Sequence, residues 1–184
     1  MRKDFGAKPM LVPQPVCILA TYDENGVPNA MNAAWAGIAE MNQIIVCLGP
    51  HKTTENLEKC PDFTLSVGTK EQVVACDYVG IVSGKKVPDK VAKAGFTTTK
   101  APYVNAPIIN ELPLTMECKL LKILEEELYL AEIVNVCVDE SVLNEDGLIS
   151  YEKFHPIIYD TLFHGYYELG TKVGNAFSDG KKIQ

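Results

Sequence analysis

The sequence has no long apolar run: no hydrophobic stretch reaches the ~18 residues that a membrane-spanning helix needs. Its first residues, MRKDFGAKP, lack the apolar segment of a secretory signal. Basic side chains are also in deficit, since 17 lysines and arginines against 24 acidic residues give a net charge of −7. A net acidic chain is a poor partner for bulk nucleic acid. We therefore expect a soluble, cytoplasmic protein that binds neither membranes nor nucleic acid.

Closely spaced cysteines are absent as well. The six cysteines are scattered, and the nearest two are Cys47 and Cys60, which excludes a CxxC redox pair or a zinc knuckle. The sequence has three histidines and no HExxH motif. We expect no metal site, and free cysteines that behave as small apolar side chains in a reducing compartment.

The length of 184 residues, with 47% hydrophobic and 22% charged side chains, is typical of one globular domain. No repeat, low-complexity stretch or linker divides the chain, so a single domain over residues 1–184 is predicted. Alternating apolar patterns and the hairpin dipeptide Asn25-Gly26 predict many short strands. The expected strands are residues 16–21, 28–39, 44–48, 63–68, 114–124, 128–138, 157–159 and 166–170.

Only short helices are expected between these strands, at residues 53–59, 71–79 and 88–95. The first would have a hydroxyl N-cap, and the last would end at Gly95. Many short strands with few, brief helices indicate a mainly β protein, a β-barrel with helical decoration.

Residues 49–56, GPHKTTEN, lead from a strand into a helix. Such a loop presents free backbone N–H groups, and Lys52, Thr53 and Thr54 add a positive charge and hydroxyl donors, which together suit a phosphate. The segment is not a Walker A loop, because it lacks the first glycine. The alternative is a capped surface helix with a solvated lysine.

Three further segments carry candidate chemistry. Residues 29–37, NAMNAAWAG, would let a flat ligand approach the backbone, or would simply pack tightly on a neighbour. Residues 82–90 hold Lys85, Lys86 and Lys90, which suit an anionic cofactor or a solvated surface. His164 among aromatic residues would be a proton donor or a packed side chain.

The order of these motifs resembles the flavin reductase-like family, and within it the flavoredoxin type. The resemblance rests on the small-residue strand with the sole tryptophan, HKTxxN, FTLSVGT, GIVSGKKVPDK, AEIVNVCVDE and YYELGTKVGNAF. It covers residues 13–180, with HKTxxN and the tryptophan strand as its most specific parts.

The resemblance implies an FMN-binding split β-barrel that forms homodimers with one FMN per subunit near the interface. The flavin ring would lie against residues 29–35 and the phosphate at residues 51–56. Lys90 and Phe163 would be later contacts, with Lys85 and Lys86 competing for the role of Lys90. The implied cofactor-binding residues are Asn29, Met31, Asn32, Ala33, Ala34, Trp35, Leu48, His51, Lys52, Thr53, Asn56, Ser83, Lys90 and Phe163.

The implied activity is that of an NAD(P)H-dependent flavin reductase, in which hydride passes to N5 of FMN and then to free flavin or an electron-transfer partner. Because FMN performs the chemistry, no catalytic side chain is predicted. Two alternatives stay open. One is an FMN-binding electron carrier reduced by a redox protein, since there is no GxGxxG fingerprint for a nicotinamide nucleotide. The other is a split-barrel module that binds another ligand, such as haem or pyridoxal phosphate.

Overall fold

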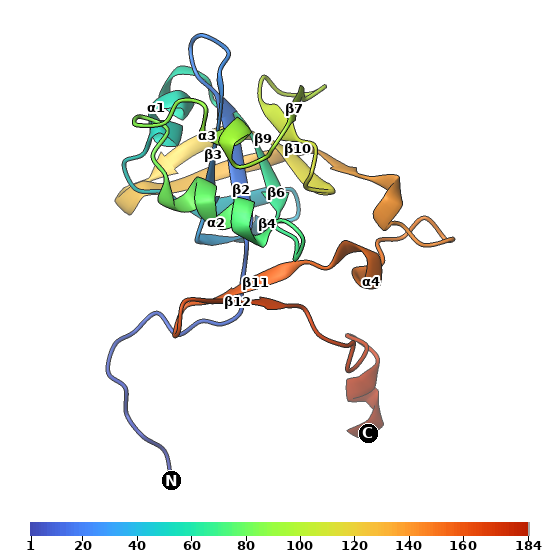
Figure 1. The fold of residues 1–184 in the computed structure, drawn as a ribbon. Helices are drawn as coiled ribbons and strands as arrows, with labels where there is room; N and C mark the ends of the chain where they lie inside the picture. Colours follow the sequence, from blue (N-terminus) through green and yellow to red (C-terminus); the bar gives the residue numbers. More distant parts are fainter. Residues whose placement is uncertain (184) are drawn as a thin grey trace.

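A computed structural model describes residues 1–183. Its main element is a seven-stranded sheet in the order β3-β2-β6-β9-β10-β5-β4, which curls into a half-barrel (Figure 1). All neighbouring strands are antiparallel. The seven strands are β2 (Cys17–Tyr22), β3 (Pro28–Ala33), β4 (Trp35–Glu40), β5 (Gln43–Cys47), β6 (Asp62–Val67), β9 (Leu114–Leu124) and β10 (Leu128–Val138).

Short helices and two small sheets complete the structure, so the predicted fold class, mainly β with brief helices, is confirmed. The helices are α1 (Lys52–Lys59), α2 (Val73–Ile81), α3 (Lys90–Lys93) and α4 (Tyr151–Phe154). The small sheets contain β7 (Thr98–Lys100) with β8 (Pro107–Ile109), and β1 (Gln14–Pro15) with β11 (Ile157–Asp160) and β12 (Gly165–Glu168). Within residues 1–183, no helix combines the length and the hydrophobicity required to span a bilayer.

The β2–β3 hairpin forms as its turn residues predict. Gly26 has a φ of +77°, a conformation that glycine adopts without steric cost. The Asp23 carboxylate accepts hydrogen bonds from the backbone N–H groups of Asn25 and Val27, at 2.8 and 2.9 Å. This turn places the first residues of β3 beside the start of α1.

The expectation of one strand over residues 28–39 was wrong. The segment forms β3, which pairs with β2, and β4, which pairs with β5, with Ala34 between them. These two strands are the opposite ends of the seven-stranded sheet. Alanine and glycine at positions 33, 34, 36 and 37 offer little steric resistance to the change of direction. The predicted ligand strand is therefore a corner at which the chain crosses the open side of the half-barrel.

Two apolar clusters cover the two faces of the sheet. Leu19, Val46 and Phe63 belong to the cluster inside the half-barrel, whereas Ile18 and Val79 belong to the cluster between the sheet and α2. Successive residues of β2 enter opposite clusters because side chains alternate along a strand. Both faces of β2 are thus buried, which fixes the position of its partner β3.

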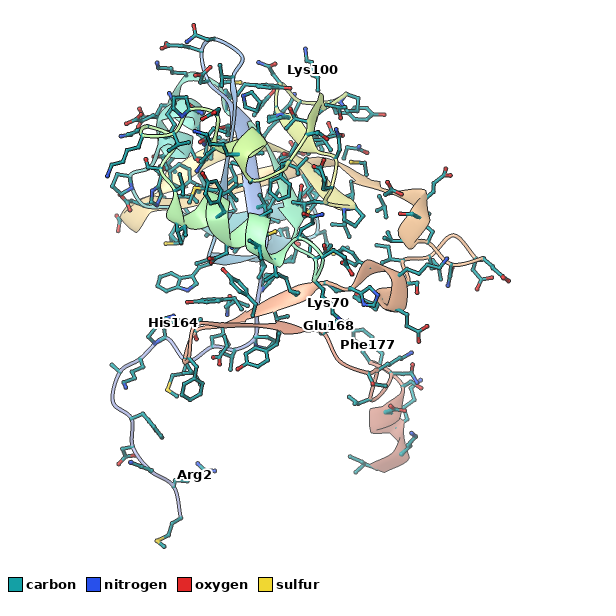
Figure 2. The ribbon with its side chains drawn as sticks, in the orientation of Figure 1. Arg2, Lys70, Lys100, His164, Glu168 and Phe177 are labelled. Atoms are coloured by element: carbon teal, nitrogen blue, oxygen red, sulfur yellow. The ribbon has the colours of Figure 1, made fainter. Side chains whose placement is uncertain are left out.

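The strands expected over residues 157–159 and 166–170 form, but in the separate sheet with β1. This sheet lies beside the half-barrel, and both chain termini extend from it away from the barrel (Figure 1). Glu168 accepts from Lys70 at 2.8 Å (Figure 2). It also pairs with Nδ1 of His155 at 2.7 Å. The first contact joins β12 to the segment that precedes α2, and the second joins it to the end of α4.

The helices differ in detail from the expectation. The N-cap of α1 is His51 and not a threonine, so the predicted hydroxyl cap was wrong. The Thr54 hydroxyl lies within the first turn, where it accepts from the His51 N–H at 2.9 Å and donates to the His51 carbonyl at 2.8 Å. The pattern also missed β7, β8 and α4, which are three or four residues long.

Candidate functional site

A pocket of about 260 Å³ opens at the beginning of α1. Three chain segments meet there: the β2–β3 hairpin, the first turn of α1, and the loop that follows α2. Gly49 and Pro50 end the preceding strand and start the turn into α1, which brings that helix over the hairpin. The lining residues are Asp23, Val27, Pro28, Asn29, Lys52, Glu55, Gly84, Lys85 and Pro88.

Asn29 is the most informative of these residues. Its side chain is 5% exposed, and its Nδ2 donates to Oγ1 of Thr53 at 2.8 Å. Its Oδ1 is buried and has no hydrogen-bond partner among residues 1–183. An unsatisfied buried polar atom costs about 1–3 kcal/mol. If the amide is flipped, the Thr53 hydroxyl donates to Oδ1 and the NH₂ group becomes the unpartnered one. In either orientation, Asn29 has one hydrogen-bonding group left for a ligand.

Gly84 closes one side of this pocket. A Cβ at this position would lie 2.3 Å from Oδ1 of Asn29 and 3.4 Å from Cγ of Lys52. Only glycine lets the loop after α2 approach the Asn29 amide so closely. The pocket is therefore a cradle formed by backbone, with the free amide atom of Asn29 at the same place.

The pocket is lined by two lysines and by the carboxylates of Asp23 and Glu55, and its donor groups suit an anion with nearby hydroxyl groups. The first turn of the eight-residue helix α1 supplies backbone N–H groups and the positive end of the helix dipole. Lys52 and Lys85 line the pocket, and Lys85 pairs with Glu55 across it. This donor set, two ammonium groups and a helix start beside a free amide, suits a phosphate ester.

The structure brings together three predicted site residues, Asn29, Lys52 and Thr53. Two others lie at the margin. His51 is exposed at the cap of α1, and Ser83 is an exposed neighbour of Gly84 whose hydroxyl accepts from the Lys85 N–H at 3.3 Å.

Three predicted residues have structural partners away from the pocket. Leu48 is buried inside the half-barrel, and Asn56 is 2% exposed and donates to Oγ1 of Thr21 at 2.9 Å. Lys90 is buried, and its Nζ donates to the carbonyl oxygens of Val79 and Val82 at 2.9 and 2.8 Å. These are carbonyls at the end of α2, and burial lowers the pKa of Lys90 to about 8. Cofactor contacts by these three residues stay predictions.

Residues 29–37 include side chains that pack tightly and side chains that are exposed, the two alternatives that the sequence left open. Asn32 faces α2, where a Cβ on Gly80 would lie 2.9 Å from Cβ of Asn32. Met31 and Ala33 belong to the cluster inside the half-barrel. Tight packing therefore accounts for these positions. Ala34 and Trp35, in contrast, are exposed where β3 ends and β4 begins.

Trp35 borders a second hollow, of about 240 Å³, with Pro9, Leu11, Gln14 and Thr161. The next predicted residue, Phe163, is 80% exposed in the β11–β12 loop. It borders a neighbouring hollow of about 200 Å³ that Thr161 also lines. His164 follows it, with Nδ1 2.6 Å from the Tyr159 hydroxyl. Trp35 and the loop of Phe163 therefore line neighbouring hollows, and neither residue lines the pocket of Lys52.

Several residues of these sites were missed by the sequence pattern. Gly84 follows the predicted Ser83 directly, and its need for glycine becomes visible only with Asn29 in place. Gln14 and Thr161 carry no motif of their own. Tyr166, which donates to Asp77 at 2.8 Å and lies 3.4 Å from Nδ2 of Asn32, was expected as a strand residue and as an aromatic neighbour of His164.

An antiparallel half-barrel with a phosphate-suited pocket at its α1 corner defines a class, the split β-barrel proteins. The family model described as "Flavin reductase like domain" matches residues 10–161. The chain therefore belongs to the flavin reductase-like family, as the motif order predicted.

Solved structures agree with this assignment. The chain is 37% identical to flavoredoxin of Desulfovibrio vulgaris (Miyazaki F), with a TM-score of 0.94, covering 98% of this chain and 100% of that one. It is 25% identical to flavoredoxin from Methanosarcina acetivorans, with a TM-score of 0.89 and full coverage of both, 100% each. An uncharacterized protein of Aquifex aeolicus is 26% identical over 160 residues, 80% of this chain and 81% of the relative.

Proposed function

We propose that this protein binds one FMN per chain and acts as an oxidoreductase that takes electrons from NAD(P)H. The observation that carries the proposal is the unpartnered, buried amide atom of Asn29 in the pocket at the start of α1. That atom, the Gly84 cradle and Lys52 fit the phosphate and ribityl end of the cofactor. Family membership and the similarity to two flavoredoxins support flavin as the bound group.

The phosphate would be held by Lys52, the hydroxyl of Thr53 and the first N–H groups of α1. From Asn29 to Trp35 the chain advances six residues, up to about 20 Å at ~3.3 Å per residue. The far end of this segment would receive the flavin ring, where Ala34 leaves the backbone accessible and Trp35 is exposed. The phosphate and the ring would then occupy opposite ends of β3.

Bound FMN supplies hydride and electron transfer at its ring, and the chain supplies binding and orientation. Backbone N–H groups at the Ala34 corner would orient the ring and stabilise negative charge on it. Such preorganised donors contribute about 2.7–4 kcal/mol each at anionic transition states in other enzymes. Trp35 and the β11–β12 loop would limit access of water and of the second substrate. No proton-transferring side chain is assigned.

Reconstitution with FMN tests the proposal. Protein stripped of ligand should take up one FMN per chain and become yellow. Anaerobic NADH or NADPH should then bleach the flavin absorbance in a stopped-flow instrument. Bleaching by reduced ferredoxin alone would instead identify an electron carrier. A colourless protein that ignores FMN would contradict the proposal and favour a split-barrel module for another ligand.

We further propose that two chains associate, because apolar side chains are exposed on three strands of the seven-stranded sheet. Ile38, Leu121, Ile123 and Val136 are each about half exposed or more, on β4, β9 and β10. An apolar sheet face of this kind marks an interaction site. The six cysteines are free thiols, consistent with work in the reducing cytoplasm.

A further inference from the structure

We propose that Glu55 and Lys85 form a gate over the phosphate pocket, in which Glu55 occupies Lys85 until the phosphate of the cofactor displaces it. The inference rests on the proposed binding of FMN and adds a regulatory step to that same site. It assigns the second phosphate cation to Lys85, in place of Lys86 or Lys90.

The positions of the lysines support this choice. Lys85 lines the pocket, whereas Lys86 does not, and the ammonium of Lys90 is bound by two carbonyl groups at the end of α2. The loop that carries Lys85 is held against Asn29 by the close approach of Gly84. Lys85 and the unpartnered amide of Asn29 therefore line the same pocket before any ligand arrives.

Glu55 competes with a phosphate for the Lys85 ammonium group and for the positive end of the α1 dipole. It pairs with Lys85, and it lies in the first turn of α1, where the helix dipole favours a negative charge. Lys85 lies close enough to Glu55 to lower the pKa of that carboxyl, which keeps it ionised. A phosphate entering the pocket would repel Glu55 and take its place beside Lys85. Glu55 thus lowers the affinity for the cofactor, and Lys85 raises it.

The ion pair between Glu24 in the β2–β3 turn and Lys59 at the end of α1 offers a matched control. Its members are 61% and 54% exposed, against 48% and 51% for Glu55 and Lys85. Neither Glu24 nor Lys59 lines the pocket. E24Q and E55Q change the net charge equally, so a difference between them reports position and not total charge. K86Q is the corresponding control for K85Q.

The experiment measures FMN and riboflavin affinity of ligand-free wild type, E55Q, K85Q, the double variant, E24Q and K86Q by fluorescence titration. E55Q should tighten FMN roughly two- to fivefold, the range of an exposed ion pair. K85Q should weaken FMN about tenfold. In the K85Q background, E55Q should have no effect, and neither control should change FMN affinity. Riboflavin, which has no phosphate, should bind all six proteins equally.

Two results would overturn the gate while leaving the proposed function intact: FMN affinity that E55Q leaves unchanged or lowers, or a gain from E55Q that persists in the K85Q background. Wild-type protein that binds no FMN would overturn the proposed function itself, and the gate with it. Tight riboflavin binding without any preference for FMN would retain a flavin site but exclude the gate.

Discussion

Lys52 and Thr53 meet the pocket from adjacent positions in the first turn of α1. Lys52 lines it directly, and Thr53 is bonded to Asn29. We expect K52A/T53A to raise the dissociation constant for FMN by at least the roughly ten- to hundredfold that corresponds to one lost charged hydrogen bond of about 1.5–3 kcal/mol. Titration of the ligand-free variant measures this change.

K52A alone guards against a packing defect, since Thr53 is buried. K59A, at the other end of α1, should leave FMN affinity unaltered. Undiminished affinity in the double variant would move the phosphate to the lysines near Ser83.

The buried side chain of Lys90 makes the stability of the folded protein depend on pH. Burial lowers its pKa from 10.5 to about 8, so between these values the unfolded chain carries a proton that the folded chain lacks. Stability from this group therefore rises with pH across that window and is lowest below about pH 8. The difference in unfolding free energy between wild type and K90M, from urea titrations at pH 7, 8, 9 and 10, should grow with pH.

At neutral pH, K90M should still be less stable than wild type, by about 1–3 kcal/mol, because the carbonyls of Val79 and Val82 lose their donor. A difference that does not vary with pH would contradict a lowered pKa for Lys90.

Among the elements, packing of α2 on β3 depends on Gly80. An alanine there would bring its Cβ to 2.9 Å from Cβ of Asn32. Although alanine favours helix by about 1 kcal/mol over glycine, overpacking costs about 1–3 kcal/mol. We expect G80A to be destabilised in urea titrations and to bind FMN more weakly, since β3 must shift.

Gly170 is the control for G80A, because no atom lies within 4 Å of a Cβ there and its φ is not positive. G170A should match wild type. Stabilisation by G80A would mean that α2 and β3 are less tightly packed than the structure shows.

Sequence patterns located the strands well where apolar residues alternate, and both long strands of the β9–β10 hairpin begin and end as predicted. They failed at Ala34, because small residues are compatible with a straight strand and with a corner. They also gave no sign of β7 and its partner, whose few residues have no periodicity to detect.

For the candidate site, the pattern selected Lys52 and Thr53 because a strand-to-helix loop with these residues suits an anion. The hydrogen bond from Asn29 to Thr53 joins two motifs that are far apart in the sequence, so neither motif alone predicts it. The burial of Lys90 depends on where α2 ends, which no local pattern specifies. Lysines close together in sequence therefore looked equivalent and have different environments.

At the scale of the whole molecule, apolar side chains on β4, β9 and β10 are exposed to solvent in the single chain. Ile38 on β4 is 75% exposed. We expect wild type to have about twice the chain mass of 20.2 kDa by light scattering, and I38E to shift toward the single-chain mass, because a carboxylate buried in an apolar interface is costly.

V74E is the matched control, since Val74 is 79% exposed on α2, away from the exposed apolar residues of β4, β9 and β10. It should retain the wild-type mass. A wild type of single-chain mass, or an I38E variant of unchanged mass, would exclude this face as the interface.

The corner at Ala34 links the two border strands of one sheet, which make no ladder with each other. A flavin resting there would touch both borders and act as a clasp on the open side of the half-barrel. Bound FMN should then slow backbone hydrogen exchange in β3 and β4 together, although these two strands do not pair with each other. Loss of the cofactor would then also destabilise the two border strands, so variants that retain FMN poorly would be less stable as well.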